Sequence, residues 1–336
     1  MRASVVIPCF NSLKYLPETL LTVLAQTCDD FEVVLVDDGG SDDLAGWAAT
    51  FPDGTGDPRV RVVRQENAGV SAARNLGVTS AQGDVVVFCD SDDLWAPTLV
   101  ADLVGALDRN PAAGLAYGWY DLVDGDGTPT GRVVRSEWEG DVWEQFVTRN
   151  PVSASAVAVP RAVLDDVGLF LVNRDRFPID VEDWELWIRI AGRYPVVVVR
   201  EVLAHHRRHD SNSSSNVESL SAAYAHLLAA VFDDETPARQ ALRPSATART
   251  ELLLAWHCLN DRQDPAAALD HLKVAKAHDP DVRRSTEFWR ILAAATALRA
   301  TGDRGYGWVR SANRAARRVL SALPVHKLRR ESTYSP

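Results

Sequence analysis

The sequence has few cysteines and lacks several features that would place it in a familiar class. Its four cysteines, among 336 residues, show no metal-ligand or redox spacing, so disulfides are not expected. No apolar run approaches the ~20 residues of a membrane span, and the N-terminus enters a strand pattern at once, without a signal peptide. The net charge of −10 argues against nucleic acid as a partner. These absences predict a cytoplasmic protein, and its length suggests roughly two domains.

Apolar runs rich in β-branched residues alternate with helical patterns in the N-terminal part of the chain. The runs are Ser4–Phe10, Phe31–Val36, Val60–Arg64 and Val85–Cys89. Strand and helix alternation predicts an α/β fold, a mostly parallel sheet flanked by helices, in which ligands bind beyond the carboxyl ends of the strands. The turn after the first run, Phe10–Tyr15, has no glycine, which excludes a dinucleotide-binding turn.

Three aspartates crowd the end of the last of these runs, in the turn Asp90–Asp93. Unpaired carboxylates so close together raise one another's pKa, and a cation relieves their repulsion. Mg²⁺ or Mn²⁺ held by one or two carboxylates keeps positions open for phosphate oxygens. The turn therefore predicts a site for a metal and a phosphate. The alternative is that Ser91 and Asp92 cap the next helix.

Five segments together resemble the family 2 glycosyltransferases, which have the GT-A fold. They are VVIPCFN from Val5, VVLVDDGGSDD from Val33, ENAGVSAARNLG from Glu66, CDSDDLW from Cys89 and VEDWELWIRI from Val181. Their order, over the first two-thirds of the chain, carries the resemblance. Gly40 is a departure, because the family more often has Ser after Asp-Asp-Gly; the carboxylates stay in place.

The resemblance implies a site for a nucleotide-diphosphate sugar. Asp38 is expected to accept a hydrogen bond from the imide of the base, Asp90 to meet the ribose, and Asp92 to bind the Mn²⁺ or Mg²⁺ that bridges the diphosphate. The remaining residues expected to bind the nucleotide sugar are Pro8, Phe10, Asn11, Arg74 and Ser91. Each has a structural alternative, with Phe10 in the core, Asp38 in a turn before two glycines, and Arg74 on a helix surface.

The segment Val181–Ile190 has apolar residues at helical spacing and acidic residues at its start. Trp184, Trp187, Ile188 and Ala191 predict a helix that docks on the sheet. The resemblance implies that Asp183 is the general base for the acceptor hydroxyl, with Glu182 as the backup base and Glu182 or Trp184 as acceptor contacts. A carboxylate at a helix N-terminus is also explained by the helix dipole alone.

The segment His205–Ser215 is polar and has no apolar anchor, so composition predicts a flexible surface loop. In the family a Tyr-Arg-x-His pattern lies at a similar place. By this resemblance Arg207 is expected to bind phosphate and His209 the metal, a role that neutral imidazole fills for Mn²⁺. The loop would then close over the donor and shield it from water.

The second half of the chain predicts helices. We expect a catalytic domain at 1–216, a helical accessory domain at 217–302, and a basic amphipathic helix and tail at 303–336. The pattern AAALDHLKVAKAHDP, from Ala266, resembles one helix of a tetratricopeptide repeat. The tail carries a charge of +6 and the remainder −16. Such a helix docks on an acidic protein surface, its own or a second subunit's, or makes a peripheral contact at the inner face of a membrane.

The interpretation as a whole is a metal-dependent, inverting glycosyltransferase. Its expected donor is a uridine diphosphate sugar, and its expected acceptor is a saccharide or a lipid-linked or surface-polymer precursor. A catalytically inactive sugar-nucleotide binding module is the first alternative. An Asp-dependent phosphatase is the second, although that chemistry expects its motif at the first strand and a Thr soon after, where Leu94 and Trp95 stand here.

Overall fold

The computed structural model describes residues 2–172, 181–209, 217–233, 235–260 and 262–302. It divides into two compact units, Met1–Ala246 and Thr247–Pro336. Unit 1 contains the sheet and the helices around it, as well as α8, whose Tyr224 ring lies 5.7 Å from that of Trp184. The predicted division at residue 216 stays a prediction. The predicted basic helix and tail, 303–336, lie outside the described residues.

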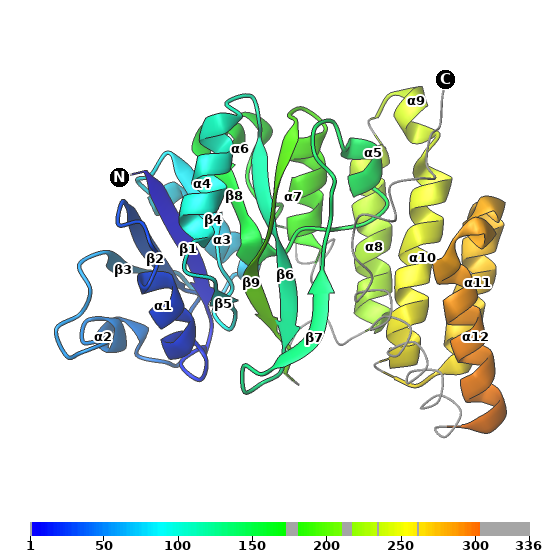
Figure 1. The fold of residues 1–336 in the computed structure, drawn as a ribbon, viewed down its shortest axis with the longest axis horizontal. Helices are drawn as coiled ribbons and strands as arrows, with labels where there is room; N and C mark the ends of the chain where they lie inside the picture. Colours follow the sequence, from blue (N-terminus) through cyan, green and yellow to red (C-terminus); the bar gives the residue numbers. More distant parts are fainter. Residues whose placement is uncertain (1, 173–180, 210–216, 234, 261, 303–336) are drawn as a thin grey trace, which may run out of the picture. The chain divides into compact units, whose positions relative to one another are not determined.

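Nine strands of the described residues form one sheet, in the order β3-β2-β1-β4-β8-β6-β9-β5, with β7 paired to β6 (Figure 1). The pairs β3–β2, β2–β1, β1–β4 and β6–β9 are parallel, and the remaining pairs are antiparallel. The strands are β1 (Ala3–Cys9), β2 (Phe31–Asp37), β3 (Val60–Arg64), β4 (Val85–Phe88), β5 (Leu94–Trp95), β6 (Leu115–Val123), β7 (Pro129–Val134), β8 (Val157–Pro160) and β9 (Val196–Arg207).

Helices cover both faces of this sheet. Val5 and Ile7 of β1 join a core with α1 and α4 on one face. On the other face, Val6 lies against Gly77 of α3, and Phe88 of β4 contacts Trp187 of α7 with ring centroids 6.0 Å apart. The helices of unit 1 are α1 (Leu16–Leu24), α2 (Leu44–Ala48), α3 (Val70–Ser80), α4 (Leu99–Arg109), α5 (Trp143–Phe146), η1 (Ala154–Ala156), α6 (Arg161–Val167), α7 (Glu182–Ala191), α8 (Val217–Phe232) and α9 (Pro237–Gln240).

Most of the predicted elements are confirmed. The four apolar runs are β1 to β4, and each is buried or partly buried because a parallel strand is covered on both faces. The predicted docking face of α7 is buried, with Trp187 fully enclosed. The alternative that Ser91 and Asp92 cap a helix is wrong, because β5 follows the acidic turn and α4 begins only at Leu99.

The prediction of a surface loop from His205 is wrong for its first three residues. His205, His206 and Arg207 are the last residues of β9. They pair with β6, where Asp121 lies opposite His205 in the register, and the two side chains meet at 2.6 Å between Nδ1 and Oδ1. A partner strand that is distant in the sequence thus overrides the polar composition.

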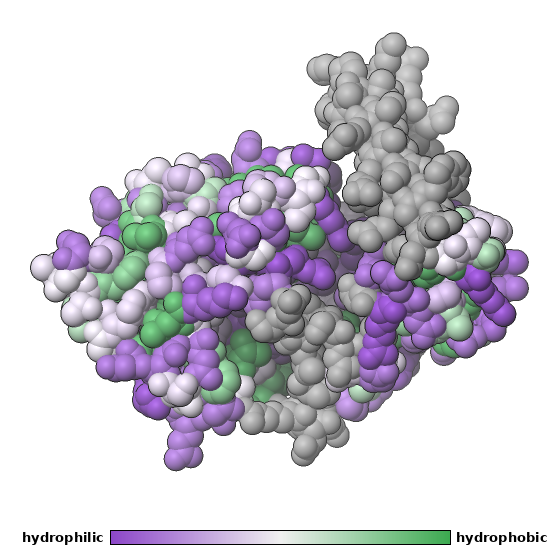
Figure 2. All heavy atoms as spheres, turned by 90° about the horizontal axis from the view of Figure 1, so that it is seen from below, coloured by the Kyte–Doolittle hydropathy of each residue, from purple (hydrophilic) through white to green (hydrophobic). Residues whose placement is uncertain are grey.

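The described part of unit 2 is helical, as predicted. It contains the greater part of α10 (Arg243–Asn260), followed by α11 (Pro265–His278), η3 (Pro280–Arg284) and α12 (Thr286–Thr301). Asp264 caps α11 through the backbone N–H groups of Ala266 and Ala267. None of the helices in the described ranges combines the length and the apolar character needed to cross a membrane. Figure 2 shows a face on which hydrophilic residues dominate and apolar patches are small.

Candidate active site

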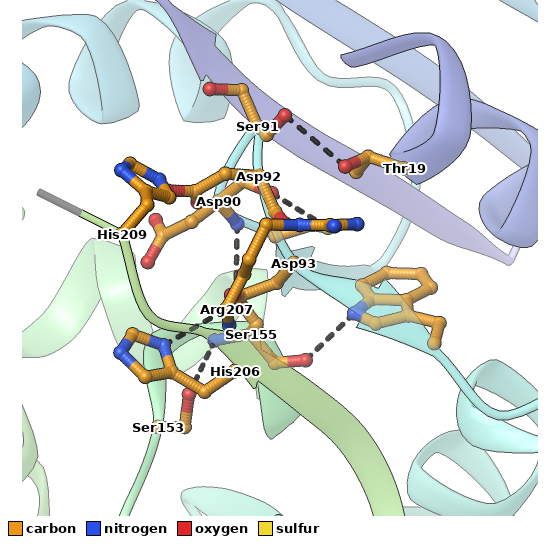
Figure 3. Close-up of polar contacts among 12 residues, drawn as sticks. Thr19, Asp90, Ser91, Asp92, Asp93, Ser153, Ser155, His206, Arg207 and His209 are labelled. Atoms are coloured by element: carbon orange, nitrogen blue, oxygen red, sulfur yellow. Dashed lines mark hydrogen bonds and ion pairs between the residues drawn. The ribbon is translucent and has the colours of Figure 1, made fainter. Parts of the chain in front are cut away.

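The acidic turn after β4 is held by hydrogen bonds from three distant elements (Figure 3). Ser155 Oγ accepts from the backbone N–H of Asp90 at 2.9 Å, and Thr19 Oγ1 donates to the carbonyl of Ser91 at 3.1 Å. Arg207 Nε donates to the carbonyl of Asp92 at 2.7 Å. The turn is therefore rigid before any ligand binds, and the fixed backbone aims the Asp92 carboxylate at the cavity.

Arg207 is an internal anchor of this region. Its side chain is 1% exposed. Besides the Asp92 carbonyl, its guanidinium donates to the carbonyl of Gly125 at 3.0 Å and to Glu18 Oε2 at 2.7 Å. These contacts tie β9, α1 and the loop after β6 to the acidic turn. The phosphate role expected for Arg207 stays a prediction.

Asp92 and His209 lie together, and they fit a divalent metal. His209 Nε2 and Asp92 Oδ2 are 2.8 Å apart, and Tyr15 stacks on the imidazole with ring centroids at 4.6 Å. Burial, with the charges of Asp93 and Asp90, raises the pKa of Asp92 to about 6, and a cation would relieve that repulsion. One carboxylate oxygen and one imidazole nitrogen suit Mn²⁺. In the described ranges no group of three or more ligand side chains gathers at one point.

Asp93 and His206 form a second pair beside the turn, in which Asp93 is enclosed and His206 lines the cavity. Asp93 is 0% exposed; it accepts from the backbone N–H of Arg207 at 2.8 Å and faces His206 Nδ1 at 3.3 Å. Burial by itself would raise the pKa of Asp93, but the charge and hydrogen bond of His206 hold it below its ordinary value. Burial would lower the pKa of His206, but Asp93 raises it to about 9. The two therefore form an ion pair at neutral pH.

The two aspartates after β2 are also buried, and both accept hydrogen bonds from several donors. Asp37 accepts from the backbone N–H groups of Gly39 and Gly40 at 3.1 Å and from Arg64 Nη1 at 2.7 Å. Gly39 has φ of +73°, a conformation that favours glycine. Gly40 is the position at which the sequence departs from the family pattern. A Cβ atom there would lie 2.9 Å from the backbone nitrogen of Asn11. Glycine at position 40 thus allows Asn11 to approach.

Asp38 holds the loop that leads into α3. Its Oδ1 accepts from Gln65 Nε2 at 2.7 Å and from the N–H of Ala68 at 2.8 Å. Its Oδ2 accepts from the N–H of Gly69 at 2.9 Å and from Asn67 Nδ2 at 3.3 Å. Asp38 also lines the cavity, so its expected contact with a base stays a prediction. In the structure this carboxylate first of all orders the loop.

Arg74 joins the acidic turn to the start of α7. This side chain is 5% exposed and donates to Asp90 Oδ1 at 2.7 Å and to Glu182 Oε1 at 2.5 Å. Its Nε is buried without a partner in the described part of the chain. Arg74 is therefore not a surface residue. Its ion pair with Glu182 occupies the carboxylate of that residue. Glu182 is accordingly less free than Asp183 to accept a proton.

Asp183 is the acidic side chain of α7 that faces the cavity with few donors. Its Oδ1 accepts from the backbone N–H of Trp184 at 2.6 Å. Burial and the neighbouring Glu182 raise its pKa to about 7, although the Arg74 cation opposes the shift. A carboxylate with a pKa near neutrality is suited to take up a proton from a hydroxyl group.

A cavity of about 460 Å³ brings most of the predicted residues together. The predicted residues in its wall are Pro8, Phe10, Asp38, Arg74, Asp90, Ser91, Asp92, Glu182 and Asp183. Phe10 is 54% exposed, so it is not a core residue. Two predicted residues lie outside the wall. Asn11 accepts a hydrogen bond from the N–H of Ser41 at 2.7 Å. Trp184 is 3% exposed, and its Nε1 donates to the carbonyl of Phe146. The donor contact expected of Asn11 and the acceptor contact expected of Trp184 stay predictions.

The cavity also contains residues to which the sequence assigned no role. They are Cys9, Val70, Ala73, Tyr120, Asn150, Val152, Ser153, Ala154 and His206. Cys9, Val70 and Ala73 belong to segments that carry the resemblance, and His206 belongs to the segment that starts at His205. Tyr120 is on β6, residues 150–153 belong to the loop before η1, and Ala154 begins η1. Only the polar dipeptide Arg149-Asn150 before Pro151 marks this loop in the sequence. Tyr120 and this loop enter the site because β6 pairs with β8 and β9, which are distant in the sequence.

Comparison with known proteins reveals relatives of one kind. A family model described as Glycosyl transferase family 2 matches residues 4–152. An uncharacterized glycosyltransferase of Nostoc sp. is 30% identical over 65% of this chain and 68% of its own length. One of Rickettsia felis is also 30% identical, but this chain spans only 30% of its length. TuaG of Bacillus subtilis, a glycosyltransferase provisionally named for teichuronic acid biosynthesis, is 27% identical over 63% of this chain and 81% of its own.

Solved structures show the same fold. Staphylococcus aureus TarS 1–349 has a TM-score of 0.56 at 18% identity, over 94% of this chain and 92% of its own. The mannosyltransferase PcManGT of Pyrobaculum calidifontis, in complex with GDP-Man and Mn²⁺, has a TM-score of 0.54 at 21% identity, over 96% of this chain and 88% of its own. TarS has also been solved with UDP-GlcNAc. The fold is therefore GT-A, with additional C-terminal helices.

Proposed function

The chain belongs to glycosyltransferase family 2, and from this premise we propose that it is a metal-dependent, inverting transferase using a nucleoside diphosphate sugar. The observation that carries the proposal is the single cavity shared by Asp92 and Asp183. Asp92 lies at the end of the cavity that is expected to hold the leaving diphosphate. Asp183 has a pKa raised to about 7, which suits a base. A base and a leaving-group site in one cavity are what a direct displacement requires.

The proposed donor is a UDP-sugar. The relatives solved with UDP-GlcNAc and with GDP-Man support a nucleotide sugar of this general kind. In this chain Pro8, Phe10 and Val70 supply an apolar wall on which a base could lie. Asp38 and Asp90 line the same cavity with oxygen acceptors for the base and the ribose.

Asp92 and His209 would hold the metal. When bound, Mn²⁺ or Mg²⁺ would act as a Lewis acid that stabilises the charge on the departing diphosphate. The contribution of the chain itself is to hold the two ligand side chains in place. Tyr15 packs on the His209 ring, and Arg207 fixes the backbone of Asp92. Both supports exist in the protein alone.

Asp183 is the proposed general base. The acceptor O–H gives its proton to the Asp183 carboxylate while the acceptor oxygen forms the new bond to the anomeric carbon. The bond from that carbon to the diphosphate oxygen breaks, and its electron pair leaves with the nucleoside diphosphate. One displacement inverts the anomeric centre and needs no covalent enzyme intermediate. A positioned base of this kind contributes about 10²–10⁴ to the rate.

The proposed acceptor is a saccharide or a lipid-linked or surface-polymer precursor. Support comes from TuaG, whose name assigns it provisionally to the synthesis of such a polymer. A peripheral contact at a membrane or with another subunit, through the basic segment 303–336, remains a sequence-based proposal.

A donor screen tests the proposed function. Purified protein is incubated with UDP-Glc, UDP-Gal, UDP-GlcNAc and GDP-Man, with Mn²⁺ or with EDTA, and release of the nucleoside diphosphate is measured. We expect slow release from at least one UDP-sugar that depends on the metal. Tight binding of a donor without any release, also in the presence of saccharide acceptors, would instead favour the inactive binding module.

A further inference from the structure

One wall of the cavity presents polar groups that the protein itself does not use. Tyr120 lies on β6, and Asn150 lies in the loop between α5 and η1. Within the described ranges, the Tyr120 hydroxyl has no hydrogen-bond partner. Asn150 accepts from the N–H of Val152 at 3.0 Å, but its amide NH₂ has no partner among the same residues. Polar groups in a cavity wall that lack a partner are available to a ligand.

A second tyrosine on the same strand shows the contrast. The Tyr117 hydroxyl lies 2.8 Å from both Ser136 Oγ and the carbonyl of Trp138. Tyr117 is 0% exposed, so its hydroxyl completes an internal hydrogen-bond network. Tyr120 is three residues further along β6, faces the cavity and is left with free hydrogen-bonding capacity. The difference indicates that the Tyr120 hydroxyl is not needed to build the fold.

Tyr120 lines the same cavity as Asp92 and Asp183, the residues proposed for the leaving-group end and the base. Its ring is 6.3 Å from that of His206, which is paired with Asp93 of the acidic turn. The sugar that is transferred must lie between the diphosphate and the base, inside this cavity. Tyr120 is therefore placed where it can contact that sugar.

We propose that the Tyr120 hydroxyl and the Asn150 amide bind hydroxyl groups of the donor sugar and determine which sugar is accepted. The inference rests on the proposed function and extends it to two residues that no motif indicates. A neutral phenol and a neutral amide match sugar hydroxyls, which both donate and accept hydrogen bonds. Discrimination follows because an epimer that points a hydroxyl elsewhere leaves these groups unpaired.

The test compares Tyr120→Phe and Asn150→Ala with the wild-type protein, using donor hydrolysis without acceptor. For the preferred UDP-sugar, kcat/KM should fall by about 2- to 12-fold in each variant, the effect of one neutral hydrogen bond. The preference for this sugar over its epimer should narrow by a similar factor. The affinity for UDP, which lacks the transferred sugar, should not change. Tyr117→Phe is the matched control: it removes a hydroxyl from the same strand and should leave the sugar preference unaltered.

The possible failures are distinguishable. If the wild-type protein releases nucleotide from no donor, the proposed function fails. If it is active but both variants keep the wild-type ratio between epimers, this inference alone is overturned. Equal losses of UDP affinity and donor turnover would also overturn it, because they indicate a general distortion of the cavity. A change confined to the KM of an acceptor would assign the two residues to the acceptor instead.

Discussion

The two acidic regions of the cavity are supplied with hydrogen-bond donors in different ways. On the side proposed for the nucleotide, Asp37 and Asp38 are each 4% exposed, and protein donors surround both oxygens of each. Around the proposed metal ligand and the proposed base, few contacts are found. His209 faces Asp92, and the N–H of Trp184 donates to Asp183. The pKa values of Asp92 and Asp183 are raised to about 6 and about 7.

This contrast divides the carboxylates into two groups. Asp37 and Asp38 order the site, whereas Asp92 is proposed to bind the metal and Asp183 to take up the proton. A buried carboxylate that accepts several N–H bonds orders the chain around it. A buried carboxylate with few donors is costly to ionise, and it gains most from a cation or a proton supplied by a ligand. We therefore expect substitutions on the nucleotide side to reduce stability and substitutions on the other side to reduce activity.

The largest effect is expected from Asp183→Asn. The substitution keeps the shape and the hydrogen bond from Trp184 but removes the base, so transfer should slow by about 10²–10⁴ fold. Donor affinity should remain close to that of the wild type, because the interaction belongs to the transition state. Single-turnover transfer and calorimetric donor binding measure the two quantities. Asp165→Asn, at an exposed position, is the control. Full transfer by Asp183→Asn would move the base to Glu182.

Asp92→Ala should act on the donor and the metal. Loss of the carboxylate leaves His209 as the remaining proposed ligand, so metal-dependent donor affinity should fall by at least about 10- to 100-fold. Calorimetric titration with the UDP-sugar, with and without Mn²⁺, measures this. Circular dichroism should show an intact fold, because the turn is held through the Asp92 carbonyl and not its side chain. An unchanged affinity would remove Asp92 from the site.

On the nucleotide side, Asp38→Asn should reduce stability. Asn offers one acceptor oxygen where the loop 65–69 presents four donor contacts, so at least one buried N–H loses its partner. The expected loss is about 1–3 kcal/mol in the free energy of unfolding, measured by urea denaturation next to Asp165→Asn. A drop in UDP affinity with unchanged stability would contradict the contrast and make Asp38 a ligand contact first.

Much of the fold was predictable because buried parallel strands appear in the sequence as continuous apolar runs. This signal located β1 to β4 and, with them, the acidic turn at the end of β4. The face of α7 was predictable for a similar reason, since its helical spacing is regular. The positions of the carboxylates at the end of β4 and the start of α7 follow from these elements, whereas the roles expected of Asp92 and Asp183 came from the resemblance to the family.

The rest depends on contacts between segments far apart in the chain. Arg207 meets Glu18 and the carbonyl of Asp92 only after β9 has paired with β6. Ser155 reaches the acidic turn in the same indirect way, and Tyr120 shares its strand with residues that face elsewhere. Local patterns contain no information on such pairing, and the polar composition around His205 pointed to a loop.

The sharpest test of the contrast is the stability of Asp183→Asn. Because burial and Glu182 raise the pKa of Asp183 from 3.8 to about 7, ionising it opposes folding. The stability associated with its protonated form is present in full below the unfolded-state value and is lost as the pH rises through 7. At pH 8 the neutral Asn should thus give a higher Tm than the wild type, and each 1 kcal/mol gained corresponds to about 2–4 °C in a domain of 150–250 residues. At pH 5 the difference should be smaller, and it should disappear only below about pH 3.8, where the side chain is protonated in both the folded and the unfolded state. Thermal unfolding of both proteins across this range measures it. A Tm below the wild-type value at pH 8 would mean that Asp183 stabilises the fold as Asp38 does, and the distinction between the two acidic regions would be lost.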